Sequence, residues 1–183
     1  ACNLSRVATL QFLSAGDHAT MPWLSFDVSN YGLGPGVLPN PHGDIGHSCS
    51  VDSDKGRRAI VDMVKIQQWY TTQIHYLLTA LDSIPEGNGT VLDNTIILWG
   101  NELGDPATHS NMNVPLVVAG GGGKFRMGRY LKYSTTTRPD CVGNVCSAQT
   151  AHNHVLVSIL QAFGIEENTF GSTAYTGPLA GLT

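Results

Sequence analysis

The sequence predicts an α/β fold in which a mostly parallel sheet is flanked by helices and joined by long loops. Three short apolar runs, at residues 6–13, 95–99 and 114–119, are typical of buried strands. Two longer segments, 54–83 and 148–163, carry apolar residues at helical spacing. The resulting order of strand, helix, strand, strand and helix indicates an α/β layer.

The first predicted element is a buried strand at residues 6–13, which small residues follow. Residues 14–53 show no clear period and are rich in proline and glycine. A connection of this length is generally functional or disordered. Because it contains Trp23, Phe26 and Tyr31, we expect it to be ordered.

The longest helix is predicted over residues 54–83. Ser53 or Asp54 can cap its N-terminus, and Pro85 lies just beyond its end. Its apolar residues recur three, four or more positions apart and predict one buried stripe. They are Ile60, Val64, Tyr70, Ile74, Leu77 and Leu81.

The second half of the chain alternates apolar runs with polar loops. The strands at 95–99 and 114–119 are separated by a polar loop, and a third short strand is expected at residues 130–133. The last helix, 148–163, ends before Gly164. No repeat is visible, so we expect a single α/β domain over residues 1–183.

Composition excludes several function classes. Charged residues make up 13% of the chain, about half the usual fraction. The net charge of −4 and the pI of 5.9 argue against a nucleic-acid-binding protein. No apolar run approaches the roughly 18 to 20 residues of a membrane span.

The four cysteines allow three pairings. Cys141 and Cys146 flank a short turn-like segment, so we favour a disulfide between them, which leaves Cys2–Cys49 as the second bridge. A metal site at Cys141 and Cys146 is the alternative, although their spacing is not that of zinc ligands. The even cysteine count and the scarcity of lysine predict a secreted or periplasmic protein.

Polar residues gather where the predicted strands end. In an open α/β sheet, sites form in the loops at the carboxyl ends of the strands. Imidazole and carboxylate groups together are the ligands of divalent metal ions. The candidate ligands are His42, Asp44, His47, Glu102, His109 and His154. The alternative is that these side chains only satisfy the backbone groups of glycine-rich loops.

A local basic cluster follows the four glycines at 120–123. Within it, Arg126 and Arg129 are candidates for holding an anionic substrate group, and a solvated hairpin face is the alternative. No serine lies in a nucleophile elbow, and no cysteine has the surroundings of a nucleophile.

Six segments that run through nearly the whole chain form a further pattern. They are residues 4–11, 42–47, 67–70, 92–104, 114–121 and 154–160. Together they resemble a secreted bacterial family of unassigned activity, the HXXSHH-type proteins. The chain resembles the C-terminal half of these proteins, which fits the absence of an initiator methionine. The resemblance implies an N-terminal half of the same precursor, or another chain, as a partner.

The family in turn is similar to the alkaline phosphatase and sulfatase superfamily, so the resemblance implies an alkaline-phosphatase-like C-terminal portion. It implies metal ligands at Glu102, at the pair Asp44 and His47, and at His152 or His154. The superfamily's nucleophile would lie in the N-terminal half, outside these residues.

Two functions follow. The first is a metal-assisted hydrolase-like domain acting on a phosphate or sulfate ester, with zinc, manganese or calcium as the ion. The second is a non-catalytic extracellular binding or structural protein that retains the fold and binds calcium, a glycan or a partner chain through its polar loops.

Overall fold

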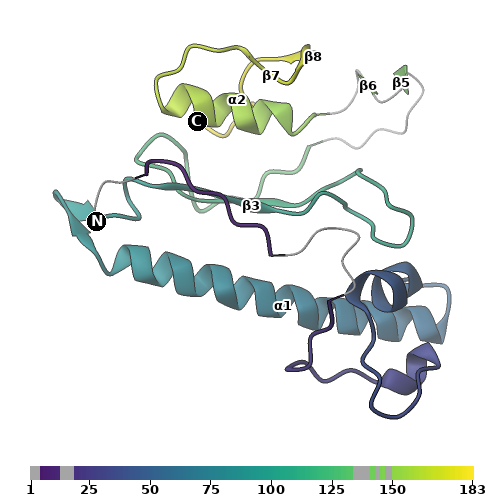
Figure 1. Cartoon of the computed structure of the whole chain (residues 1–183). Coiled ribbons are helices and arrows are strands. Elements are labelled where there is room, and N and C mark those ends of the chain that lie inside the picture. The colour runs from purple at the N-terminus through teal and green to yellow at the C-terminus, as the bar shows by residue number, and fades with distance from the viewer. Residues whose placement is uncertain (1–4, 13–18, 134–140, 143–144, 147–149) are drawn as a thin grey trace. The chain divides into compact units, whose positions relative to one another are not determined.

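The computed structural model describes residues 5–12, 19–133, 141–142, 145–146 and 150–183 (Figure 1). The chain divides into two compact units. The first unit consists of residues 1–73 and 105–110, and the second consists of residues 74–104 and 111–183. The single domain expected over residues 1–183 stays a prediction.

Helix α1, Asp54–Asp82, confirms the predicted long helix. The Ser53 hydroxyl accepts a hydrogen bond from the backbone N–H of Gly56 at 3.0 Å, which caps the first turn. The buried residues of α1 are Gly56, Ala59, Asp62 and Ile66. The predicted apolar stripe therefore only approximates the buried face, and its member Val64 is exposed.

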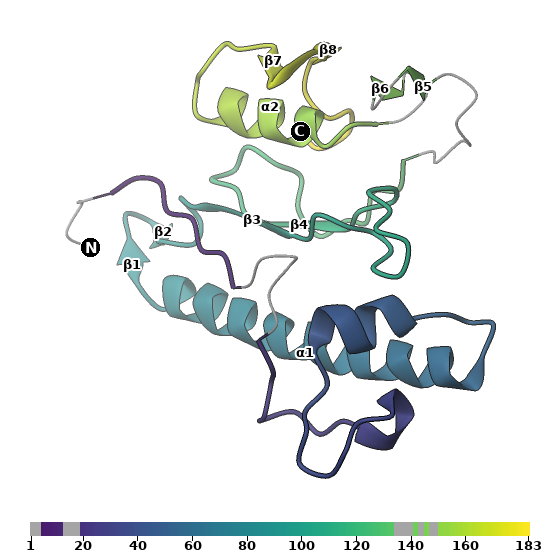
Figure 2. The ribbon, with the colours of Figure 1, turned by 45° about the vertical axis from the view of Figure 1, so that its right-hand side comes forward.

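Three short helices lie in the long loop of the first unit. They are η1 (Val28–Tyr31), the π-helical turn η2 (Pro41–Ile45) and η3 (Gly46–Ser48). Met21, Ile45 and Ile66 form the buried core that joins this loop to α1. Figure 2 shows the dark blue short helices beside the N-terminal half of α1. The loop at 14–53 is thus ordered where the structure describes it, as its aromatic residues predict.

The strand predicted at residues 6–13 is wrong for the part that the structure describes. Residues 5–12 contain no strand, and both Val7 and Leu10 are more than three-quarters exposed. An apolar run becomes a strand only when another strand pairs with its backbone groups, and none does so here among the described residues.

The mostly parallel sheet is also wrong, and with it the alkaline-phosphatase-like C-terminal portion that the resemblance implied. Strand β3 (Ile96–Gly100) pairs antiparallel with β4 (Leu116–Gly120), with Leu98 opposite Val118. The other described strands form antiparallel pairs as well, so no pair in the described part of the chain is parallel. These pairs are β1 (Pro85–Glu86) with β2 (Gly89–Thr90), β5 (Cys141–Val142) with β6 (Val145–Cys146), and β7 (Thr169–Phe170) with β8 (Ser172–Thr176).

The connection between β3 and β4 explains this difference. A parallel pair needs a crossover, usually a helix, whereas the residues between these strands form turns and one isolated bridge. The chain therefore turns back on itself. Apolar runs indicate that strands are buried, but they carry no information about direction.

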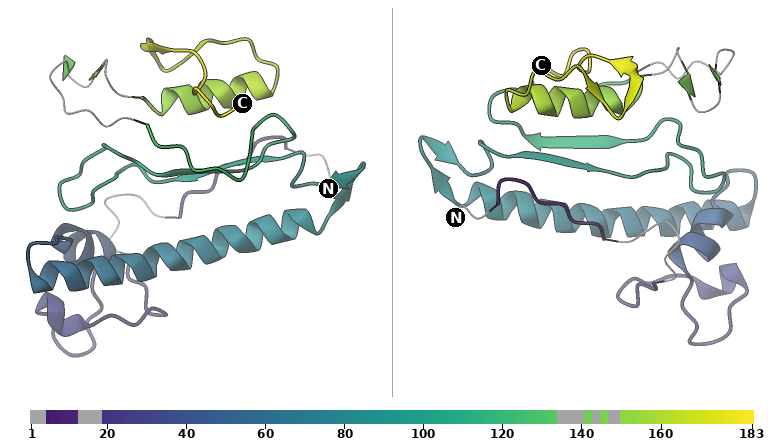
Figure 3. Two further views of the ribbon diagram at one scale, coloured as in Figure 1. Left: turned by 180° about the vertical axis from the view of Figure 1, so that it is seen from behind. Right: turned by 45° about the horizontal axis from the view of Figure 1, so that its top comes forward.

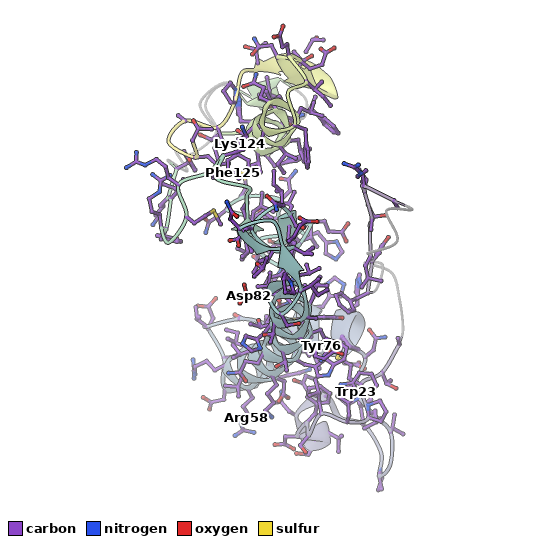
Figure 4. The ribbon with its side chains drawn as sticks, turned by 90° about the vertical axis from the view of Figure 1, so that its left-hand side faces the viewer. Trp23, Arg58, Tyr76, Asp82, Lys124 and Phe125 are labelled. Carbon is purple, nitrogen blue, oxygen red and sulfur yellow. The ribbon has the colours of Figure 1, made fainter. Side chains whose placement is uncertain are left out.

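Helix α2, Asn153–Ala162, covers one face of the β3–β4 ribbon in the second unit (Figure 3). Val155 on α2 packs with Phe125, Leu179 and Leu182 in a buried cluster, to which Ile96, Leu116 and Val118 of the ribbon contribute. Figure 4 shows Phe125 below α2. The strand predicted at residues 130–133 is not formed.

Candidate metal centre

Two of the predicted ligands, His42 and His47, lie on consecutive short helices of the first unit. The Asn40 side chain caps η2 by accepting hydrogen bonds from the backbone N–H groups of His42 and Gly43, at 2.9 and 2.7 Å. At the end of η2, Ile45 is fully buried and anchors the turn in the core. The segment thus holds both imidazoles on a fixed backbone.

The third histidine, His109, lies in a short closed loop of the same unit. Asp105 and Ser110 pair across the base of this loop through two backbone hydrogen bonds of 3.3 and 3.1 Å. Inside it, the Asp105 carboxylate accepts hydrogen bonds from the Ala107 N–H and the Thr108 hydroxyl, at 2.9 and 2.7 Å. His109 has a φ of 54°, a left-handed conformation in which histidine is enriched among non-glycine residues.

Gly46 is where the two segments meet. It is buried, and a Cβ added at this position would lie 3.5 Å from Cβ of Pro106 and 3.2 Å from the carbonyl oxygen of Pro41. Gly46 therefore lies at the packing contact between the loop 105–110 and the turn that carries His42, and the tightest approach is to the Pro41 carbonyl oxygen of that turn.

The three imidazole rings form one cluster. Their centroids are 4.8 Å apart for His42 and His47, 5.4 Å for His42 and His109, and 4.7 Å for His47 and His109. One ring nitrogen from each lies within 4.8 Å of the other two, so this three-histidine group can hold a metal ion. His42 is half-buried, while His47 and His109 are exposed.

Within the cluster, Nε2 of His42 and Nε2 of His47 lie 3.0 Å apart. Zinc–nitrogen bonds of about 2.0–2.1 Å in a tetrahedron place two ligand nitrogens about 3.3 Å apart. This pair is therefore close to the separation that a shared ion requires. The ring nitrogen of His109 lies within 4.8 Å of both.

The ligand set favours one class of ion. Imidazole nitrogens suit zinc, copper, nickel and cobalt, whereas calcium and magnesium require oxygen ligands. Three protein ligands leave a fourth position for water or substrate, as in catalytic zinc sites. Exposed rings at His47 and His109 leave that position accessible.

Two ionisable groups near the cluster have shifted pKa values. The Thr108 hydroxyl and then the Ala107 N–H bind the Asp105 carboxylate and hold its pKa below the ordinary value. Burial raises the pKa of the Cys49 thiol, and the Asp105 carboxylate adds to this effect. Cys49 donates to the carbonyl oxygen of Ile45 and stays a protonated thiol at neutral pH.

The other three predicted ligands are not part of the histidine cluster. The Asp44 carboxylate accepts a hydrogen bond from the backbone N–H of Asn40 at 2.8 Å and so closes its own turn. Glu102 and His154 belong to the second unit. Nδ1 of His154 lies 2.9 Å from the carbonyl oxygen of Gly177, which ties α2 to the C-terminal segment. None of these three is a member of the histidine cluster.

The predicted anion-binding arginines also belong to the second unit. Arg129 donates from Nε to the carbonyl oxygen of Arg126 at 2.8 Å and from its guanidinium to the carbonyl oxygen of Gly181 at 2.5 Å. Its guanidinium therefore holds the C-terminal turn. The backbone N–H of Arg126 likewise donates to Leu182.

Of the predicted disulfides, Cys2–Cys49 is not formed, because Cys49 is a free cysteine. Cys2 itself lies outside the described residues. The backbone register places Cys141 directly opposite Cys146, and the side chains of both lie outside the described part of the structure. That bridge stays a prediction.

Comparison of the chain with models of protein families, with curated proteins and with solved structures finds no match. Among the described residues, no helix has both the length and the apolar character needed to cross a bilayer.

All three histidines of the cluster are among the ligands predicted from the sequence, whereas the residues that position them are not. Asn40, Gly46 and Asp105 fall in this second group. Asn-Pro at 40–41 and Asp-Pro at 105–106 are typical starts of turns. These two dipeptides are the sequence patterns from which the turns at Asn40 and Asp105 could have been predicted. Gly46 has none, because only the packed structure shows what approaches it.

Proposed function

We propose that the chain binds one divalent transition-metal ion, preferentially zinc, through His42, His47 and His109. The observation that carries the proposal is the clustering of three imidazoles whose ligand atoms lie within 4.8 Å of one another. A set of three nitrogen ligands supports zinc over the calcium and manganese alternatives.

The activity we propose for this centre is hydrolysis of a phosphate or sulfate ester. A bound zinc ion supplies a Lewis acid that polarises an ester oxygen. The chain contributes three neutral ligands, which leave the charge of the ion uncompensated and available to an anionic substrate. The exposed edges of His47 and His109 leave room for that substrate.

A non-catalytic role for the same ion is the second candidate, and the origin of the ligands favours it. His42 and His47 come from one segment, and His109 comes from a loop more than sixty positions later. An ion held by all three would crosslink these segments and stabilise the first unit by mass action.

Metal binding is tested on protein stripped with a chelator and titrated with zinc against a chromogenic competitor. We expect one equivalent to bind, and we expect His42→Ala, His47→Ala and His109→Ala each to weaken binding at least about tenfold. His75→Ala is the matched control, because His75 is an exposed histidine of α1 outside the cluster. Failure to bind zinc, or equal loss in the control, would contradict the proposal.

Two measurements distinguish the catalytic role from the structural role: ester hydrolysis and thermal stability. Zinc-loaded protein is assayed with 4-nitrophenyl phosphate and 4-nitrophenyl sulfate, and its thermal midpoint is measured with and without zinc. Zinc-dependent turnover that His47→Ala abolishes supports the hydrolase. A zinc-dependent rise in the midpoint without turnover supports the structural role and excludes hydrolysis of these esters.

A further inference from the structure

A groove with a volume of about 410 Å³ lies on the first unit, away from the residues of the histidine cluster. One wall is α1, which contributes Lys65, Gln68, Trp69 and Thr72. These positions are three, four and seven residues apart, so they share one face of the helix. The other wall is the segment 23–25.

Trp23 is presented on this groove by a tight turn. The backbone N–H of Leu24 donates to the carbonyl oxygen of Met21 at 3.0 Å, and Pro22 follows Met21 in the turn. Met21 is 2% exposed and Leu24 packs against the same core, whereas Trp23 is 56% exposed. Both ends of the turn are therefore anchored while the indole ring stands at the surface. Figure 4 shows Trp23 at the side of α1.

Trp69 forms the second aromatic surface and is held by its neighbours. Its ring centroid lies 5.2 Å from that of Trp23, 5.1 Å from that of Tyr70 and 6.1 Å from that of Phe12. The planes of Trp23 and Trp69 are inclined by 42°. The two indoles thus pack against each other at a fixed angle, and the exposed part of Trp23 forms an aromatic surface that exists before any ligand binds.

The groove carries no net charge once the ion pair of Lys65 is counted. Lys65 donates to the Asp62 carboxylate at 2.7 Å and to the carbonyl oxygen of Ser25 at 2.8 Å, so its charge is compensated. Gln68 is exposed and offers an amide, and the Thr72 hydroxyl donates to the Gln68 carbonyl oxygen while keeping its acceptor lone pairs. The groove therefore offers hydrogen-bonding groups without a net charge.

We propose that this groove binds a neutral, linear oligosaccharide with β-linked pyranose rings. The axial C–H bonds of such rings make flat apolar faces that stack on indoles, and their equatorial hydroxyls reach neutral amide and hydroxyl groups at the edge. Charge complementarity selects a neutral ligand, because the one cation of the groove is already paired with Asp62. The site is separate from the proposed metal centre and does not depend on it.

A proline-rich peptide also stacks on aromatic grooves. The carbonyl oxygens of such a peptide only accept hydrogen bonds, so they leave the Gln68 amide oxygen and the lone pairs of the Thr72 hydroxyl without a donor. The amide of Gln68 instead has the donors and the acceptor that a hydroxyl-rich ligand uses. The saccharide is therefore the occupant that the groove fits better.

The test uses the Trp99→Phe variant, which leaves the two groove tryptophans as the only indoles of the chain. Its intrinsic fluorescence is titrated with cellopentaose, mannopentaose and chitopentaose, and with a decaproline peptide. We expect saturable quenching or a blue shift with at least one of the three saccharides. Trp23→Ala in wild-type protein is expected to weaken binding measured by calorimetry about tenfold or more, and Trp23→Phe to weaken it less.

Tyr76→Ala is the matched control, because Tyr76 is 74% exposed and lies outside the groove. Far-UV circular dichroism verifies that each variant is folded, and Gln68→Ala provides a second, milder groove variant. Three outcomes would overturn the proposal: no binding by any saccharide, tighter binding of decaproline, or equal weakening by Tyr76→Ala. Saccharide binding is also measured on zinc-stripped protein. If its affinity is unchanged, the groove binds independently of the proposed metal centre, whatever the outcome for zinc.

Discussion

Nε2 of His42 and Nε2 of His47 lie 3.0 Å apart, on two short helices that follow each other without a break. Either nitrogen can donate to the other when one ring carries its proton on Nε2. The same separation suits two ligands of one ion. These two residues are five positions apart in the sequence. Their side chains become neighbours because the π-helical turn that carries His42 runs directly into the helix that carries His47.

Gly46→Ala is expected to weaken zinc binding several-fold and to lower the free energy of unfolding by about 1–3 kcal/mol. The added methyl group would lie 3.2 Å from the Pro41 carbonyl oxygen, which is tighter than an ordinary contact, so the turn η2 that carries His42 has to shift by a few tenths of an ångström. Gly43→Ala is the control, since its Cβ would meet only the Asn40 side chain at 3.6 Å. Urea denaturation and zinc titration measure both effects. Equal behaviour of the two variants would show that the close approach does not position the histidines.

Tyr31→Phe is expected to destabilise the first unit by about 1–3 kcal/mol at neutral pH. The Tyr31 hydroxyl donates to the buried Asp62 carboxylate at 2.8 Å, and the variant leaves that carboxylate one partner short. Urea unfolding at pH 7 measures this loss, and Tyr76→Phe, at an exposed tyrosine, is the control.

The same tyrosine predicts a pH dependence. Burial, and next the hydrogen bond to Asp62, raise the pKa of Tyr31 above its ordinary value. Because the folded-state pKa is the higher one, the contribution is complete below about pH 10, the ordinary tyrosine pKa, and is lost as the pH rises through the folded value. Wild-type protein should therefore lose more stability than Tyr31→Phe between pH 9 and pH 12. Parallel curves for the two proteins would contradict this assignment.

Ser158→Ala is expected to cost about 1–2 kcal/mol and to loosen the C-terminal segment. Ser158 is 1% exposed, and its hydroxyl donates to the His154 carbonyl oxygen and accepts from the Leu179 N–H, both at 2.8 Å. The Leu179 N–H also donates to the His154 carbonyl oxygen at 3.0 Å, so the variant removes the shorter of its two hydrogen bonds. Hydrogen exchange at Leu179 should accelerate in the variant. Ser83→Ala removes an exposed local hydrogen bond of similar type and should change stability less. Unchanged exchange at Leu179 would argue against this role.

Cys141 and Cys146 are expected to form a disulfide in protein prepared under oxidising conditions. They are direct partners in the β5–β6 register, and opposite positions on paired strands lie within the Cα separation that a disulfide spans. Peptide mapping without reduction should find this linkage and an unpaired Cys49. The raised pKa of Cys49 predicts that its thiol is alkylated slowly at pH 7.5. A linkage that includes Cys49 would refute both statements.

The histidine cluster illustrates how much of the candidate site could be predicted from the sequence. Residue types and their clustering in loops identified His42, His47 and His109, together with Asp44, Glu102 and His154. The expectation that ligands meet at the carboxyl ends of parallel strands was wrong, since β3 and β4 are antiparallel. The cluster forms instead at the packing contact around Gly46. Three of the six candidates lie together, and they were brought together by a different arrangement of the chain from the one expected.

Local signals determined helix α1. Its capping serine, its helical spacing and the proline beyond its end act within a few residues, so the sequence alone specifies its bounds. The direction of the strands, the exposure of residues 5–12 and the choice of three histidines from six candidate ligands depend on contacts between distant segments. These contacts are decided by packing and by backbone pairing, which no local pattern encodes. The sequence by itself thus determined the long helix and the kinds of ligand, and only the tertiary structure decided which ligands converge.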